Sequence, residues 1–137
     1  MNNSSPNQAT LKTIKLSYWE GYVSIYFFLD KLFTGRKNEE FFKQVISMMN
    51  PYRPDHTIKD RTMLIDWICV FKGKDLSKEE AEVEECYRLM LKYLDMEAKK
   101  CGYNHDAILK KLSEVCNRKN NSSIWTHWIN CCLVAKV

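Results

Sequence analysis

An almost uninterrupted apolar stretch between residues 57 and 73 is the feature that most constrains how this chain folds. Apolar side chains occupy nearly every position from Met63 to Phe71, so a helix here must be covered on most of its surface. Thr57 and Asp60 have the spacing of a helix-capping pair, and Gly73 tolerates the conformation that follows a last helical turn. We therefore expect an apolar central helix in this stretch, enclosed by the first, fourth and last helices.

The remaining sequence predicts about five more helices around this one. The first runs from about residue 10 to residue 33, where Gly21 either bends it or divides it. A second begins after Asn38 and ends before Pro51. A fourth begins at Ser77, which forms a capping box with Glu80, and ends near residue 100. The last two begin near residues 104 and 122. This pattern predicts an all-α single compact bundle of about six helices over residues 9–137, without a convincing strand and with a flexible N-terminus at 1–8.

Composition narrows the class of protein. A length of 137 residues fits one domain, and only 4 Gly and 3 Pro argue against an all-β design. The net charge of +4 is spread along the chain, so nucleic-acid binding is not expected. Neither a signal peptide nor an apolar run of about 20 residues is visible, which predicts an intracellular protein, cytoplasmic or nuclear, without a membrane span. The 6 Cys are then expected to be reduced thiols.

Residues suited to metal binding or catalysis are present without a pattern that organises them. His127 and Cys131 are four positions apart on one helical face, a spacing that can bind zinc. Cys101, Cys116 or His105 would have to complete such a site, and the chain has no C-x-x-C pair. Phosphate-binding glycine loops and the common hydrolase motifs are also absent from the sequence. We therefore expect no metal, no cofactor and no enzymatic activity.

Four short segments together resemble the cyclin box of mitotic-type cyclins. Residues 61–68, RTMLIDWI, are similar to the Met-Arg-x-x-Leu-aliphatic-Asp-Trp pattern of the first box helix, with Asp60 at the position of the Met. Residues 25–29, IYFFL, resemble the N-terminal cyclin helix. Residues 93–95, YLD, resemble the second box helix, and residues 132–136, CLVAK, resemble the third. On this resemblance, residues 54–137 are a partial cyclin-box-like segment.

The resemblance implies specific contacts. In cyclins the Arg of the first box helix pairs with the Asp of the second, which here implies an ion pair between Arg61 and Asp95. The Lys of the third helix contacts the kinase, a role that falls to Lys136. A docking patch for substrate motifs would use Met63, Leu64 and Trp67.

Two classes of function are compatible with these observations. The first is a non-enzymatic helical protein-interaction module, which the resemblance narrows to a cyclin-like regulatory subunit binding a cyclin-dependent protein kinase. A regulator that self-associates or binds an unrelated partner protein belongs to the same class, and the abundance of Trp, Tyr, Phe and Met favours it. The second is a helical carrier with an internal apolar cavity for a small ligand. An exposed helical groove would favour the module, and a closed cavity above about 300 Å³ the carrier.

Overall fold

The computed structural model describes residues 14–33, 40–50, 61–102, 106–117 and 122–137. These ranges hold six α-helices, one short 3-10 helix and two short strands, which confirms the predicted all-α fold. The elements are β1 (Lys15–Leu16), α2 (Tyr18–Phe33), α3 (Glu40–Met49), α4 (Arg61–Lys72), β2 (Ala81–Glu82), α5 (Val83–Lys100), α6 (Asp106–Ser113), η1 (Glu114–Asn117) and α7 (Ser123–Ala135). The predicted flexible segment 1–8 and the capping pair Thr57 and Asp60 lie outside the described residues.

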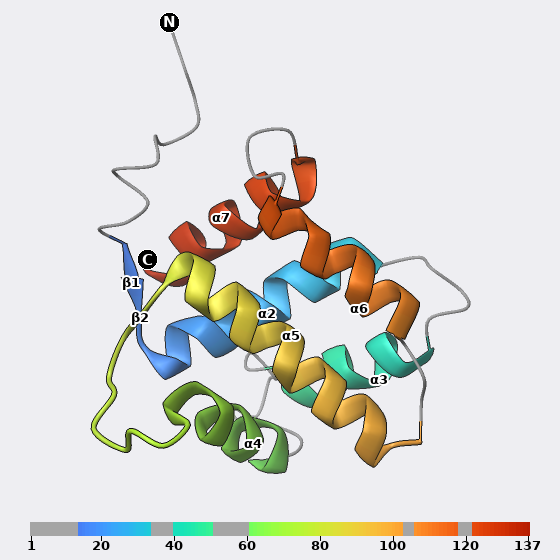
Figure 1. The fold of residues 1–137 in the computed structure, drawn as a ribbon, viewed down its shortest axis with the longest axis horizontal. Coiled ribbons are helices and arrows are strands. Elements are labelled where there is room, and N and C mark those ends of the chain that lie inside the picture. Colours follow the sequence, from blue (N-terminus) through green and yellow to red (C-terminus); the bar gives the residue numbers. More distant parts are fainter. Residues whose placement is uncertain (1–13, 34–39, 51–60, 103–105, 118–121) are drawn as a thin grey trace, which may run out of the picture.

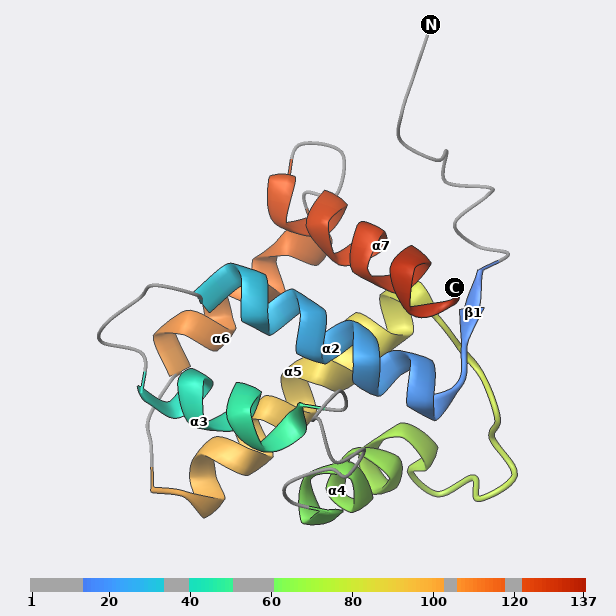
Figure 2. The same cartoon turned by 180° about the vertical axis from the view of Figure 1, so that it is seen from behind.

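Helices α2 and α5 run through the middle of the molecule and organise the other elements (Figure 1). Helix α2 packs against α3, α4 and α7, while α5 packs against α4, α6 and α7. Seen from behind, α7 lies alongside α2 over most of its length, and α4 lies at the periphery (Figure 2). The core therefore lies between α2 and α5, with α7 covering one side of it and α4 the other.

The identity of the central helix differs from the sequence prediction. Helix α4 buries Met63, Trp67, Val70 and Phe71, but Ile65 on its outer side is 56% exposed. The central apolar helix is instead α2, which buries eight of its residues: Gly21, Tyr22, Val23, Ser24, Ile25, Phe28, Leu29 and Phe33. An apolar helix can have more apolar surface than its neighbours cover. Helix α4 is such a case, because its neighbours cover it on only one side.

The start of α2 also differs from the prediction, because residues 15 and 16 form a strand. Lys15 pairs with Glu82 and Leu16 with Ala81 in an antiparallel two-stranded sheet, which joins the entry to α2 with the entry to α5. This pairing delays the start of α5 to Val83, so the predicted capping box of Ser77 and Glu80 is wrong. Ser77 instead lies in a turn, where its backbone N–H donates to the Asp75 carboxylate at 3.1 Å.

A working capping box is found at the start of α2. The backbone N–H of Ser17 donates to Glu20 Oε1 at 2.8 Å, and the backbone N–H of Glu20 donates to Ser17 Oγ at 3.1 Å. These reciprocal bonds satisfy two donors that the first turn would otherwise leave without partners. The last helix, expected to begin near residue 122, is capped by Ser122, whose side chain accepts from the backbone N–H of Trp125. Gly73, at φ +56°, ends α4 as predicted.

Gly21 does not divide α2, which is continuous from Tyr18 to Phe33. A Cβ atom at this position would lie 3.0 Å from Cζ2 of Trp67. The Trp67 ring is fixed there, because its Nε1 donates to the carbonyl oxygen of Tyr18 at 2.8 Å. The glycine therefore allows α2 and α4 to approach each other closely.

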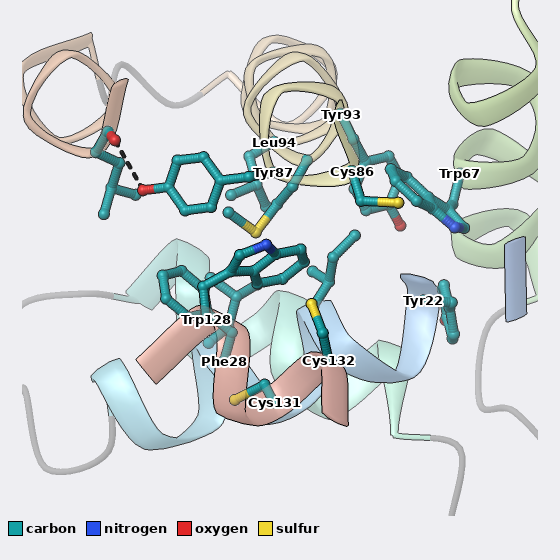
Figure 3. Packing of buried hydrophobic residues seen from close by; sticks show 14 of the residues in the cluster. Tyr22, Phe28, Trp67, Cys86, Tyr87, Tyr93, Leu94, Trp128, Cys131 and Cys132 are labelled. Carbon is teal, nitrogen blue, oxygen red and sulfur yellow. Dashed lines mark hydrogen bonds between the residues drawn. The ribbon is translucent and has the colours of Figure 1, made fainter. Parts of the chain in front are cut away.

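Buried Trp and Tyr side chains connect the helices through their polar atoms as well as their rings. Four such side chains donate to a backbone carbonyl on another element: Trp67 to Tyr18, Tyr93 to Met63, Tyr87 to Leu112 and Trp128 to Val83, all at 2.7–2.9 Å. The bond from Tyr87 is the dashed line in Figure 3, which also shows Trp128 beside Phe28 and Tyr87. Each bond fixes one pair of elements, because buried polar groups are costly without partners.

Candidate functional site

An open groove between α2 and α7 is the candidate site that the described part of the chain offers. We call it the α2–α7 groove. Its volume is about 670 Å³, and its lining residues are Phe27, Asp30, Lys31, His127, Asn130, Cys131 and Val134. A second hollow of about 360 Å³ adjoins it toward the start of α7 and shares Lys31, His127 and Asn130. Together the two hollows follow the seam along which the helices lie side by side in Figure 2.

Helical spacing explains how the sequence builds this groove. On α7 the lining residues are 127, 130, 131 and 134, which are the i, i+3, i+4 and i+7 positions of a single face. On α2 the lining residues are 27, 30 and 31, which are the i, i+3 and i+4 positions of one face. The neighbouring face of α7 carries Trp125, Trp128, Ile129 and Cys132 into the core. Core packing of that face therefore holds the groove-lining face at a fixed angle to α2.

The groove has an apolar base and a polar edge. Phe27 is half-buried and Cys131 is buried, whereas Val134 is 57% exposed and extends the apolar surface outward. Asp30, Lys31 and Asn130 are exposed and place one negative, one positive and one amide group along the edge. Apolar surface bordered by a few polar groups is typical of binding sites on helical proteins.

His127 and Cys131 lie together in the groove. The His127 ring stacks on Phe28 with a centroid distance of 5.2 Å, its Nε2 is 3.3 Å from the Phe28 carbonyl oxygen, and its Nδ1 is 3.7 Å from Cys131 Sγ. The neutral tautomer that satisfies both contacts carries its proton on Nε2, so that Nδ1 accepts from the Cys131 thiol.

The electrostatics of this pair do not favour nucleophilic chemistry. Burial raises the pKa of the Cys131 thiol to about 11, and burial lowers the pKa of His127. A reactive cysteine needs the opposite arrangement, in which a nearby positive charge lowers the thiol pKa. The thiol and the imidazole are therefore both neutral near pH 7 and act as hydrogen-bonding groups.

Candidate metal ligands do not gather around this pair. In the part of the chain that the structure describes, no group of three or more His, Cys, Asp or Glu side chains could hold a metal ion. Cys101 is exposed after α5, Cys116 is buried in η1, and His105 lies outside the described residues. No disulfide joins any of the six cysteines, which are Cys69, Cys86, Cys101, Cys116, Cys131 and Cys132.

The residues that the cyclin resemblance assigned to partner binding lie elsewhere and are mostly used inside the fold. Met63 and Trp67 are 3% and 0% exposed, so they cannot form a docking patch in this structure, and Leu64 is half-buried. Lys136 is exposed, but its Nζ donates to the Lys15 carbonyl oxygen at 2.7 Å and to Glu20 Oε1 at 3.2 Å. Lys136 thus connects the end of α7 to the start of α2.

The described residues show no ion pair between Arg61 and Asp95, which the resemblance implied. Asp95 Oδ2 is 2.9 Å from Lys99 Nζ, one turn further along α5, and Arg61 is exposed at the start of α4. The acid that α4 presents to α5 is instead Asp66, whose Oδ2 is 2.7 Å from Lys100 Nζ.

Sequence reasoning did not find the α2–α7 groove. The one available signal was the spacing of His127 and Cys131, which marked a distinct face on α7 without showing what lies opposite. The apolar residues Leu133 and Val134 near the end of α7 are 36% and 57% exposed. Among the described helices, none is both long enough and apolar enough to cross a bilayer. No protein-family model, curated protein or solved structure matches the chain.

Proposed function

We propose that this protein is a non-enzymatic interaction module that binds a helix of a partner protein in the α2–α7 groove. The observation that carries the proposal is the groove itself, with about 670 Å³ of open space along two packed helices. A partner helix can place apolar residues at i, i+3, i+4 and i+7 in such a groove. The apolar side chains of Phe27 and Val134 would receive that face, and Asp30 and Lys31 would fix its direction through charge.

The carrier proposal has less support. A carrier encloses its ligand in an internal cavity, whereas this space opens to the surface and has exposed charged groups at its edge. Its volume is nevertheless within the range of small-molecule sites, so a small ligand is one outcome that the experiment below must separate from a protein.

A cyclin-dependent kinase is the specific partner that the sequence resemblance suggests. That proposal does not draw on the groove, and the contact residues it requires are engaged within the fold. The broader proposal of a partner protein is therefore independent of the resemblance, and a kinase is one candidate for that partner.

Affinity capture with a matched pair of variants tests the groove. Val134→Asp introduces a charge on its apolar surface, and Leu76→Asp introduces the same charge at a position that is 80% exposed and outside the groove lining. We expect the wild type and Leu76→Asp to retain the same partner from cell extract and Val134→Asp to lose it. Light scattering on the purified chain identifies the case in which that partner is a second copy.

Two outcomes would reject the proposal. A wild-type chain that stays monomeric and captures no protein has no partner of the proposed kind. A partner that Val134→Asp retains as well as Leu76→Asp does binds elsewhere on the surface. A small molecule that co-purifies with the wild type and is lost from Val134→Asp, without any captured protein, would support the carrier instead.

A further inference from the structure

Two carboxyl groups and one lysine form a compact cluster where the end of α5 meets α4. Lys100 Nζ is 2.7 Å from Asp66 Oδ2 and 3.6 Å from Glu97 Oε2. Asp66 belongs to α4, whereas Glu97 and Lys100 belong to α5. The cluster therefore bridges the two helices, and in Figure 1 α4 lies on the opposite side of α5 from α7.

Glu97 is the unusual member of this cluster because it is 6% exposed. Its Oε2 is buried and no N–H or O–H donor of the described residues lies within hydrogen-bond distance of it, since Lys100 Nζ is 3.6 Å away. An ionised carboxylate in such a place loses its hydration without full compensation. A single lysine also lies beside the two acids. If Asp66 and Glu97 are both ionised, the positive charge of Lys100 neutralises only one of them.

The protonation of Glu97 follows from these surroundings. Burial raises its pKa most, the hydrogen bond and the charge of Asp66 raise it further, and Lys100 opposes the change, with a result of about 7. Asp66 from α4 and Lys100 from its own helix are the charged groups of the described chain that act on Glu97, with none from α6, α7 or the sheet. Near neutral pH the Glu97 carboxyl therefore gains and loses its proton.

We propose that the proton shared by Glu97 and Asp66 fastens α4 to α5, and that losing this proton loosens α4 while α2 and α7 stay packed. Protonated Glu97 donates to Asp66, which leaves one negative charge for Lys100 to neutralise. After deprotonation two carboxylates face each other across the interface, and their repulsion acts directly on α4. This inference is independent of the proposed partner groove.

The direction of the pH effect follows from linkage. The folded pKa of Glu97 lies above its ordinary value of 4.5, so the folded interface binds the proton more tightly than the opened one. Closure of α4 is therefore most stable below about pH 4.5, weakens as the pH rises toward about 7, and then stays at its weaker level.

Hydrogen exchange of the α4 amides measures this opening, after division by the intrinsic exchange rate at each pH. Between about pH 5 and about pH 8 we expect the opening constant of α4 in the wild type to rise on the order of 50-fold. In Glu97→Gln, which keeps the shape and cannot ionise, the rise should disappear. Asp95→Asn, which removes an acid on the same helix whose partner is Lys99, should keep the wild-type rise. The amides of α7 should show no comparable change in any variant.

The proposal fails if Glu97→Gln shows the same rise as the wild type, or if the rise spreads equally to α7. A carboxyl titration of Glu97 in the wild-type protein by carbon NMR gives an independent result that does not require the variant to fold. Titration near pH 7 supports the shared proton, and titration near the ordinary value for glutamate rejects it.

Discussion

The contact of α7 with α2 is mainly apolar, with the Lys136–Glu20 ion pair only at its end, whereas the contact of α4 with α5 includes a buried carboxyl group. Trp128 of α7 is fully buried against Phe28 of α2, edge to face at 5.5 Å, within an apolar environment. Helix α4 also buries a tryptophan, but its contact with α5 is completed by the Tyr93 hydroxyl and by the cluster of Asp66, Glu97 and Lys100.

This difference indicates which part of the molecule can respond to changes in pH and salt concentration. Apolar burial scales with area and is insensitive to pH, whereas charged groups at an interface respond to proton concentration and, when exposed, to salt. We therefore expect α7 to open only with the whole protein, and α4 to open by itself at lower free energy. The following variants test that division, beginning with the largest expected effect.

Trp128→Ala should have the largest effect of the three. It removes a fully buried ring and the bond to the Val83 carbonyl oxygen, so the free energy of unfolding should fall by about 3–5 kcal/mol. Urea denaturation measures the change. Val134→Ala on the same helix is the control, and it should cost no more than about 0.5 kcal/mol because the side chain is largely exposed. Similar losses in both variants would contradict an apolar α2–α7 anchor.

Gly21→Ala should destabilise the protein although alanine favours helices. The new Cβ lies 3.0 Å from the Trp67 ring, whose hydrogen bond to Tyr18 resists a shift, so we expect a net loss of about 1–2 kcal/mol. In a Trp67→Phe background the crowding is relieved, and the same change should become neutral or stabilise by up to about 1 kcal/mol. Equal effects in the two backgrounds would show that the close approach of α2 and α4 costs nothing.

Tyr93→Phe should have the smallest effect, about 1 kcal/mol, because it removes one buried hydrogen bond to the Met63 carbonyl oxygen. Hydrogen exchange should place the loss in α4. Tyr87→Phe is the matched control, since it removes the bond to Leu112 and should loosen α6 instead. If both variants loosen the same helix, the two hydroxyl groups do not hold separate elements.

The sequence predicted the helices well because periodic apolar positions reflect burial directly. It could not choose between Ser17-x-x-Glu20 and Ser77-x-x-Glu80, which have identical spacing. Only the first is followed at once by a helix; in the second, Ala81 and Glu82 are held as a strand by residues 15 and 16. A capping pattern does not reveal a competing partner more than 60 positions away in the chain.

The two sites were predictable to different degrees. The spacing of His127 and Cys131 showed that they share one face of α7. The groove also depends on the angle at which α7 crosses α2, and residue spacing within one helix does not predict a crossing angle. Asp66 is visible in the sequence as a charge inside an apolar stretch, where a buried charge needs a partner. Its partners Glu97 and Lys100 were hidden among the many charges of α5, since exposed and buried acids look the same in a sequence.

The four hydrogen bonds from buried tryptophan and tyrosine side chains also have a consequence for folding kinetics. They join residues that are 25, 30, 45 and 49 positions apart in the chain. Individual helices form on the microsecond scale or faster, whereas contacts between distant residues require slower loop closure. We therefore expect α2, α5 and α7 to form before these four hydrogen bonds do. Docking of the helices, and not helix formation, then sets the folding rate.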